Sequence, residues 1–302
     1  AHAKSGQWWE NEGQRALANN SVAYTDKPDM EGFMREWLSL VESKSGERGI
    51  FSRTAADKHV EMNGRRETGH EWGTNPCSEI ILRPYQFCNL TEVVVRQGDD
   101  LDSLTRKVRL ATILGTAQST FTKMPYLRKI WQKNTEEERL LGVSLTGIMD
   151  NYLLSKTSDS KIWLKKMKQT AIDTNADYAD RLGIPASAAI TCVKPSGTVS
   201  QLVDSASGIH ARHSDYYIRT VRGDNKDPLT QFMKDSGIPA EPCVMKPDST
   251  TVFSFPTKSP SGAVTRNDMT AVEQLELWKN YALHWCEHKP SVTITVKDAE
   301  WM

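Results

Sequence analysis

The chain has 302 residues, which is room for one large domain or two ordinary ones. Its 38 Lys and Arg residues balance 38 Asp and Glu residues, so the sequence excludes a global positive field for holding nucleic acid or an anionic membrane. The hydrophobic share of 38% is typical of a globular protein, and no stretch approaches the roughly 18 apolar residues of a membrane span. Five cysteines without a CxxC pair argue against a disulfide framework and favour a reduced, cytoplasmic compartment.

Strand and helix patterns alternate along the chain. The sequence predicts, in chain order, strands at 79–82 and 92–95, helices at 101–118, 135–154 and 161–182, a strand at 188–193, a helix at 229–236, a strand at 251–255, a helix at 270–285 and a strand at 291–296. Thr135 with Glu138, and Thr270 with Glu273, have the spacing of capping boxes. The alternation predicts an α/β fold, and without a repeat or linker we expect one continuous domain over 1–302.

The densest group of reactive side chains is Asn75-Pro76-Cys77-Ser78-Glu79. Pro76 disfavours a helix, so Cys77 is expected on a loop or strand end. In an extended segment Asn75, Cys77 and Glu79 point to one side, which would deliver an amide, a thiol and a carboxylate to one pocket. The structural alternative is a buried cysteine flanked by a turn residue and a solvated glutamate. Cys88 follows eleven residues later, and a second nearby thiol permits redox chemistry.

A second candidate site is the turn Pro195-Ser196-Gly197-Thr198-Val199, between a predicted strand and a helix start. Glycine permits close backbone approach, and free N–H groups at a helix start attract phosphate. The turn matches neither GxxxxGK[ST] nor GxGxxG, and many such turns bind nothing.

Three further clusters have ordinary interpretations. His210 with His213, and His284 with Cys286 and His288, offer ligand types at short spacing but follow no known zinc pattern, so we expect no metal. The basic segment 212–222 interleaves aromatic residues with charge, but we expect a solvated strand or loop near the anion site and no nucleic-acid partner.

Five motifs occur in the order found in the catalytic chain of ribonucleotide reductases: NPCSEI, FCNLTEV, LLGVSLTGIMD, KPSGTVSQL with its continuation SASGIHARHSDYYIRTVR, and HWCEHKPSVTI. The sequence most resembles the adenosylcobalamin-dependent class II enzymes of the monomeric ribonucleoside-triphosphate reductase type, over essentially its whole length. The resemblance implies part of a ten-stranded α/β barrel, with the radical cysteine on a finger loop at its centre.

The resemblance also implies roles for individual residues. Cys77 would be the thiyl radical that abstracts the ribose 3′ hydrogen, Glu79 the general base at the 3′-hydroxyl, and Asn75 a hydrogen-bonding partner of the sugar. Cys88 would supply half of the reducing dithiol. The backbone loop of residues 196–199 (Ser196, Gly197, Thr198 and Val199) would bind substrate phosphates. Adenosylcobalamin is the implied cofactor, a ribonucleotide the substrate, and a thioredoxin-like protein the external reductant.

The sequence departs from the family pattern at both ends. No cysteine precedes Cys77, so the second redox thiol is missing, as are the effector region and the C-terminal cysteine pair. Cys192, Cys243 and Cys286 match no tail position and are assigned to core or surface. We therefore expect a fragment or a split-gene portion, with little turnover alone and a complementary chain as a partner.

Two alternatives stay open. One is a nucleotide-binding C-terminal portion of a split reductase that is inert alone. The other is a cysteine hydrolase with Cys77 as nucleophile and His70 as base, although that reaction gives the phosphate loop no role.

Overall fold

The structure is a computed structural model that describes residues 2–4, 6–18, 21–43 and 49–300. Its α-helices are α1 (Trp8–Asn11), α2 (Met30–Ser43), α3 (Arg53–Asn63), α4 (Leu101–Gln118), α5 (Lys129–Glu138), α6 (Thr157–Leu182), α7 (Val199–Leu202), α8 (Pro228–Asp235) and α9 (Ala271–His284). Its strands are β1 (Ser21–Tyr24), β2 (Gly49–Ser52), β3 (Gly73–Thr74), β4 (Ile81–Leu82), β5 (Asn89–Val94), β6 (Leu141–Thr146), β7 (Tyr216–Asp224), β8 (Ala240–Pro242) and β9 (Thr250–Lys258). Short 3₁₀ turns lie at His2–Lys4, Gly13–Leu17, Ile148–Asp150 and Asp298–Glu300.

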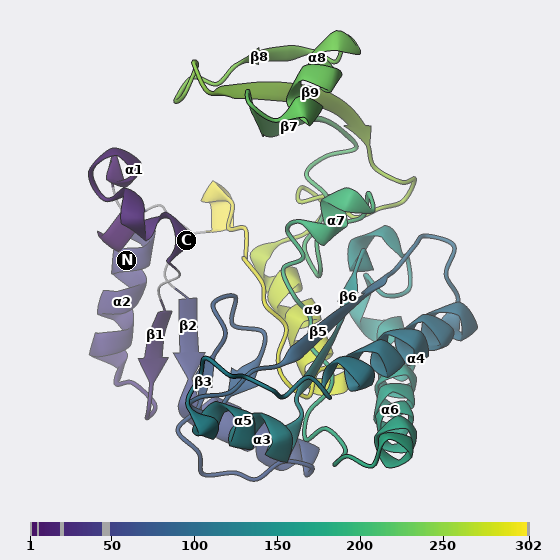
Figure 1. Cartoon of the computed structure of the whole chain (residues 1–302). Helices are drawn as coiled ribbons and strands as arrows, with labels where there is room; N and C mark the ends of the chain where they lie inside the picture. The colour runs from purple at the N-terminus through teal and green to yellow at the C-terminus, as the bar shows by residue number, and fades with distance from the viewer. Residues whose placement is uncertain (1, 5, 19–20, 44–48, 301–302) are drawn as a thin grey trace.

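Parallel strands form the centre of the fold (Figure 1). β5 pairs in parallel with β6, and the far side of β6 hydrogen-bonds the extended segment 188–193. That segment makes parallel bridges of its own, from Thr191 to Val143 and from Val193 to Pro290. Four stretches far apart in the sequence therefore lie side by side in one parallel array, which requires crossover connections between them.

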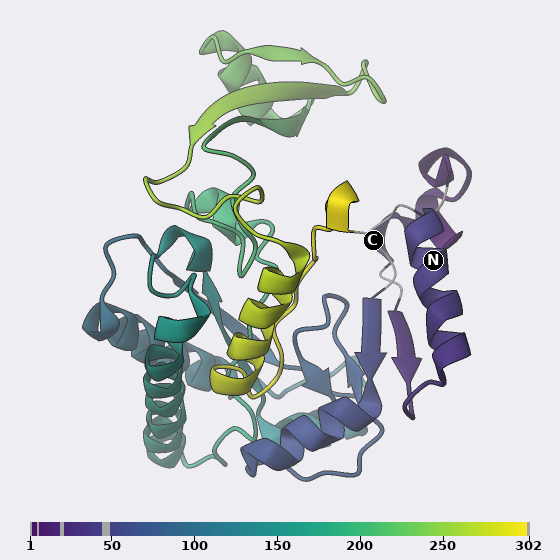
Figure 2. The same ribbon diagram turned by 180° about the vertical axis from the view of Figure 1, so that it is seen from behind.

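Helices α4, α6 and α9 cover this array. α4 packs on β5 and on α6, and α6 in turn contacts α9, as Figure 2 shows from behind. The main core contains apolar side chains from all of these elements, among them Val93, Leu104, Leu145, Met167 and Trp285. All six residues of β6 are buried, as expected of a strand covered on both faces.

A smaller core lies beneath the NPCSEI motif. Phe51, Ala56, Val60, Trp72 and Ile81 form it, from β2, α3 and the β3–β4 ladder. β3 and β4 pair antiparallel, with Thr74 opposite Ile81, so residues 75–80 form the loop that connects them. The loop that carries Cys77 thus has a packed base.

Residues 216–258 form a separate three-stranded unit, drawn in green above the rest in Figure 1. Its strand order is β7-β9-β8, with antiparallel pairing throughout. The predicted helix at 229–236 is α8, which begins at an Asp227 cap and ends before Gly237. The predicted strand at 251–255 is the middle of β9.

Several other sequence predictions are confirmed. The helices predicted at 101–118, 161–182 and 270–285 are α4, α6 and α9, and the Thr270–Glu273 capping box is present. The strand predicted at 92–95 is the latter part of β5. The α/β class is confirmed, whereas the ten-stranded barrel stays a prediction. In the described part of the chain, no helix is long and apolar enough to span a membrane.

The helix predicted at 135–154 is wrong. α5 begins earlier, at Lys129, and ends at Glu138, because Arg139 adopts a left-handed conformation with φ of 41°. Thr135 is therefore not a cap but a buried residue inside α5. The following apolar run is the buried parallel strand β6, and short apolar runs of this kind do not distinguish helix from strand by periodicity.

Three predicted strands are also corrected. Of residues 79–82 only Ile81 and Leu82 pair in a ladder, and residues 188–193 make isolated bridges. Residues 291–296 form no strand in the described structure, although Val and Ile alternate with Thr. Side chains take the place of a partner strand, because the Thr293 N–H donates to His210 and the Thr295 N–H donates to Gln274.

Candidate active site

Residues 75–78 form a tight turn, so the extended geometry predicted for Asn75, Cys77 and Glu79 is wrong. The Ser78 N–H donates to the Asn75 carbonyl at 2.9 Å, and Ser78 has a φ of 63°. Asn followed by Pro is a favoured start for such a turn. The Asn75 side-chain oxygen also accepts the Ile80 N–H at 3.0 Å, so the amide that was expected to face a ligand helps to close the loop.

Glu79 is fully buried, with an exposed fraction of 0%. Neither of its carboxylate oxygens has a hydrogen-bond partner among the described residues. An orphaned buried carboxylate is costly, and such groups occur where chemistry requires them. Among the described residues, Glu79 is therefore a buried carboxylate that no protein hydrogen bond compensates.

The two thiols differ in their surroundings. Cys77 is exposed, and Cys88 is partly buried. Burial raises the pKa of Cys77, the Glu79 charge raises it further, and Lys194 opposes both effects. Burial and the Glu79 charge also raise the pKa of Cys88, to about 12, against the opposing effect of Lys194. Since one carboxylate acts on both sulfurs, the structure brings Cys77, Glu79 and Cys88 into one neighbourhood, with both thiols protonated near neutral pH.

A buried ion pair supports the far end of this loop. Arg66 donates to both Glu138 oxygens, at 2.9 and 2.7 Å, and to the Ile81 carbonyl at 2.8 Å. Gln86 contacts both Arg66 and Glu138, and the Arg66 guanidinium lies over the Trp72 ring at 4.5 Å. This network is fully partnered, unlike Glu79, so it serves to position the segment between the two thiols.

The predicted phosphate loop is a turn that leads into a short helix. Ser196 is buried with a φ of 55°, whereas Gly197, Thr198 and Val199 are exposed at the start of the short helix α7. Among the described contacts, the N–H groups of residues 197–199 donate to nothing. A Cβ added to Gly197 would meet no atom within 4 Å, so the space above the loop is open.

A second buried ion pair holds the segment that follows this loop. Arg212 donates to both Asp150 oxygens at 2.8 and 2.9 Å, and Asp150 also accepts the Ala206 N–H. Gly208 lies so close to the phosphate loop that a Cβ there would be 2.2 Å from the Lys194 carbonyl oxygen. Residues 216–222 of the basic segment are in β7, as expected, but Arg212 is a buried structural residue.

The other candidates fall outside this neighbourhood. His70 packs edge-on against Trp72, near Asp57, and makes no hydrogen bond to Cys77 among the described residues, which disfavours the hydrolase alternative. Cys192, Cys243 and Cys286 are buried. In the described parts of the chain no group of three His, Cys, Asp or Glu residues could hold a metal ion.

Sequence reasoning missed three charged residues at the site. Lys194 influences the pKa values of Cys77, Cys88 and Glu92, and burial raises the pKa of Glu92. Lys289 is partly buried near Glu79, and burial lowers its pKa while the Glu79 charge raises it. Glu92 could have been predicted from the sequence, because it is four residues after Cys88 and strand residues an even number apart share a face. No local sequence pattern predicts that Lys289 lies at the site.

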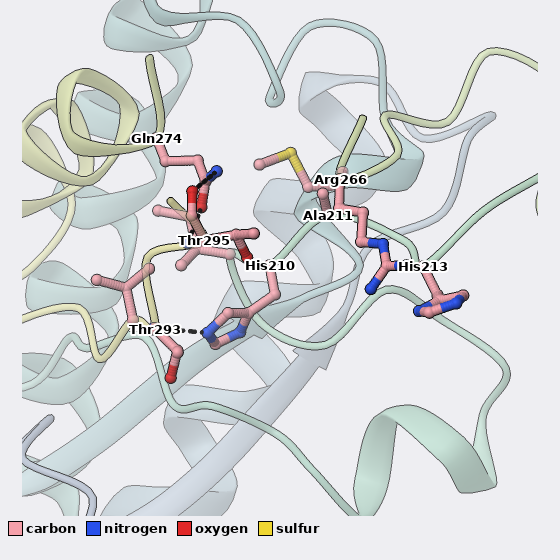
Figure 3. Close-up of a pocket in the computed structure, with 10 residues that line it drawn as sticks. His210, Ala211, His213, Arg266, Gln274, Thr293 and Thr295 are labelled. Carbon is pink, nitrogen blue, oxygen red and sulfur yellow. Dashed lines mark hydrogen bonds between the residues drawn. The ribbon is translucent and has the colours of Figure 1, made fainter. Parts of the chain in front are cut away.

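A pocket of about 190 Å³ lies between residues 209–213 and residues 292–295 (Figure 3). Its walls include Met149, His210, Arg266 and Gln274, and residues 292–295 form one side. None of the predicted site residues lines it. Ser291, the residue before Val292 of the pocket wall, donates its hydroxyl to the Cys77 carbonyl at 2.6 Å.

Known proteins resemble this chain in sequence. A scan against models of known families finds no match. The adenosylcobalamin-dependent ribonucleoside-triphosphate reductase of Lactobacillus gasseri is 28% identical over 95% of this chain and 42% of its own. That of Euglena gracilis is 28% identical over 83% of this chain and 34% of its own.

A solved structure extends the comparison to three dimensions. The crystal structure of a B12-dependent, class II ribonucleotide reductase matches with a TM-score of 0.76 and 25% identity, covering 97% of this chain and 45% of the other. The chain therefore spans less than half the length of these relatives. In sequence and in structure, the chain is therefore similar to adenosylcobalamin-dependent, class II ribonucleotide reductases.

Proposed function

We propose that this chain is the catalytic region of an enzyme that reduces ribonucleotides, of the triphosphate type, to 2′-deoxyribonucleotides for DNA synthesis. The observation that carries the proposal is the pairing of an exposed Cys77 with the orphaned, buried carboxylate of Glu79. Relatives that share the fold are ribonucleoside-triphosphate reductases. The catalytic domain is proposed to extend over residues 1–302.

The phosphate loop would position the substrate. The open N–H groups of residues 197–199 would donate hydrogen bonds to the substrate phosphates, since such groups at a helix start favour negative charge. Lys194 precedes the loop and influences both thiols, so its charge lies between the two parts of the site. Ribose bound between them would face Cys77 and Glu79.

Each residue of the site would then have a defined role in the reaction. The Cys77 thiyl radical takes the 3′ hydrogen atom of the ribose and becomes a thiol, while Glu79 takes the proton of the 3′-hydroxyl. The 2′-hydroxyl leaves as water. Two electrons and two protons come from a dithiol that includes Cys88, which ends as a disulfide. Cys77 then returns the hydrogen atom to the 3′ carbon and becomes a thiyl radical again, and Glu79 returns its proton to the 3′ oxygen. Asn75 fixes the turn and orients the sugar through its remaining amide group.

Adenosylcobalamin is the proposed cofactor. Cys77 is exposed, in contrast to the buried thiols, so a large group can approach its sulfur from outside the chain. The 190 Å³ pocket of Figure 3 is too small to enclose a corrin ring system. The ring system would therefore need protein surface outside this pocket. When bound, the cofactor supplies the radical chemistry that oxidises the Cys77 thiol by one electron.

The remaining partners follow from the same chemistry. No cysteine precedes Cys77, so the second redox thiol must come from a complementary polypeptide or from further chain. A thioredoxin-like protein would reopen the disulfide. We also propose a reduced, cytoplasmic compartment, because all five cysteines are free thiols. If the complementary part is a separate chain, this one would bind nucleotide but be inactive alone.

The test is ribonucleotide reduction by the complete enzyme with adenosylcobalamin and a dithiol reductant. Cys77→Ser should abolish deoxyribonucleotide formation and leave ribonucleoside-triphosphate binding nearly unchanged. Cys243→Ser is the matched control, since Cys243 directly follows β8 and its N–H donates to Thr250 of β9, in the separate β7–β9 unit. Turnover above background in Cys77→Ser would refute the proposed radical role.

A further inference from the structure

The segment that follows α9 passes both halves of the site, and the HWCEHKPSVTI motif that contains it has no role in the mechanism above. We propose that residues 288–293 form a strap that fixes the Cys77–Glu79 loop relative to the phosphate loop. His288 and His210 are its positioning residues. The structural claim stands on contacts alone, and its consequence for catalysis rests on the proposed function.

One end of the strap follows the Cys77 loop. The Ser291 hydroxyl donates to the Cys77 carbonyl at 2.6 Å, and the Lys289 N–H donates to the Glu79 carbonyl at 3.1 Å. His288 accepts the Ile81 N–H on Nδ1 at 3.3 Å. Three strap residues therefore bind the backbone of every second residue from Cys77 to Ile81. A movement of the strap would displace the Cys77 thiol and the Glu79 carboxylate together.

His288 also anchors the strap in the core. Its ring is fully buried, and Nε2 donates to the Leu141 carbonyl of β6 at 2.9 Å. One nitrogen accepts and the other donates, so the two partners define a single neutral tautomer. A protonated ring would turn an N–H toward the Ile81 N–H and break the contact.

The middle of the strap pairs with the segment that enters the phosphate loop. Pro290 and Val193 form a parallel bridge. The Ser291 N–H donates to the Val193 carbonyl at 2.8 Å, and the Val193 N–H donates to the Lys289 carbonyl at 3.4 Å. Val193 is only three residues before Ser196, so the strap reaches the phosphate loop through backbone contacts.

His210 joins the other end of the strap to the same loop (Figure 3). Its Nε2 accepts the Thr293 N–H at 2.9 Å, and its Nδ1 donates to the Ser207 carbonyl at 2.9 Å. The Ser207 hydroxyl lies 2.7 Å from that of Ser200 and 3.4 Å from the Ser196 carbonyl. His210 is therefore a relay between the strap and the start of α7.

The chain offers a matched control for His210. His213 lines the same pocket, but its ring is exposed and contacts Tyr217, and it has no hydrogen bond to the strap among the described residues. His210→Ala removes the relay, His210→Gln retains an acceptor and a donor, and His213→Ala removes an imidazole of no structural consequence for the strap.

The experiment measures amide hydrogen exchange of the full chain at single-residue resolution, followed by ribonucleoside-triphosphate affinity. In His210→Ala we expect exchange at Thr293 to rise about tenfold, as for one lost hydrogen bond, with a smaller rise at Lys289. His210→Gln should restore most of the protection, and His213→Ala should match the parent. Triphosphate affinity should fall in His210→Ala only.

Two results would overturn the strap. One is equal exchange in His210→Ala and His213→Ala, and the other is a rise confined to Thr293 that does not reach Lys289. Should the parent chain bind no ribonucleoside triphosphate, the proposed function fails, while the exchange data still decide the structural claim. If His210→Ala does not fold, the comparison of His210→Gln with the parent gives the same decision at lower amplitude.

Discussion

Glu79 and Glu138 are two buried carboxylates for which the structure predicts opposite responses to the same substitution. Glu79 has an exposed fraction of 0% and no hydrogen-bond partner among the described residues, whereas Glu138, at 7%, is held by Arg66 and Gln86. Lys289 is near Glu79, but no ion pair joins them in the described structure. Replacing carboxylate by amide therefore removes an uncompensated charge at one site and a compensated one at the other.

The magnitudes follow from this difference. Burying an unpartnered charged group costs more than the ~1–3 kcal/mol of a neutral polar group, so Glu79→Gln should raise the free energy of unfolding by about 1–3 kcal/mol. Glu138→Gln leaves the Arg66 guanidinium without its partner charge and should lower that free energy by about 3–5 kcal/mol. Glu79→Gln should also abolish reduction in the complete enzyme, because the amide accepts no proton.

Urea unfolding of both variants at neutral pH, followed by circular dichroism, measures the two free energies. The reasoning on Glu79 is refuted if Glu79→Gln destabilises the chain as Glu138→Gln does. That outcome would mean that the Glu79 carboxylate has stabilising partners in solution and is not held ready for a ligand.

Three further predictions concern pH, thiol reactivity and backbone space. Burial lowers the pKa of His288 to about 3, with Arg66 and His59 adding to the effect, so the unfolded chain binds the proton first as pH falls. His288 should therefore cost about 2 kcal/mol of stability between pH 7 and pH 5, and His288→Gln should remove that share of the pH dependence in urea titrations. Iodoacetamide should modify the exposed Cys77 well before Cys88, and peptide mass spectrometry that found the reverse order would contradict the site geometry. Gly197→Ala should leave thermal stability unchanged but weaken triphosphate binding, whereas Gly208→Ala, at a φ of 54° against the Lys194 carbonyl, should lower the melting temperature by several degrees.

Local sequence signals predicted the long helices well. α4 and α6 are long enough for the apolar period to be unambiguous, and the capping box at Thr270 fixes the start of α9. The same rules failed at 135–154, where a capping pattern preceded a strand buried on both faces. Burial on both faces removes the alternation by which a strand is identified.

The residue types of the site were predictable, but their arrangement was not. The cysteines and Glu79 could be named from their motifs, yet the turn at Asn75 depends on a side-chain hydrogen bond to Ile80. The strand predicted at 291–296 had the correct alternation. It lacks a partner strand because the side chains of His210 and Gln274 take its N–H groups, and no short-range pattern encodes those contacts.

The contacts that position the reactive groups join residues that are far apart in the sequence. Ser291 and Cys77 are 214 residues apart, and His288 and Ile81 are 207 apart. Closing a loop of this length costs conformational entropy, which pairing that has already formed must offset. We therefore expect these contacts to form only after β6, the 188–193 segment and Pro290 have assembled in parallel order. The Cys77–Glu79 loop is therefore expected to become ordered late in folding, when the strap docks. The parallel array that has formed by then supplies the stability that this loop lacks on its own. This explains how the unpartnered carboxylate of Glu79 is tolerated.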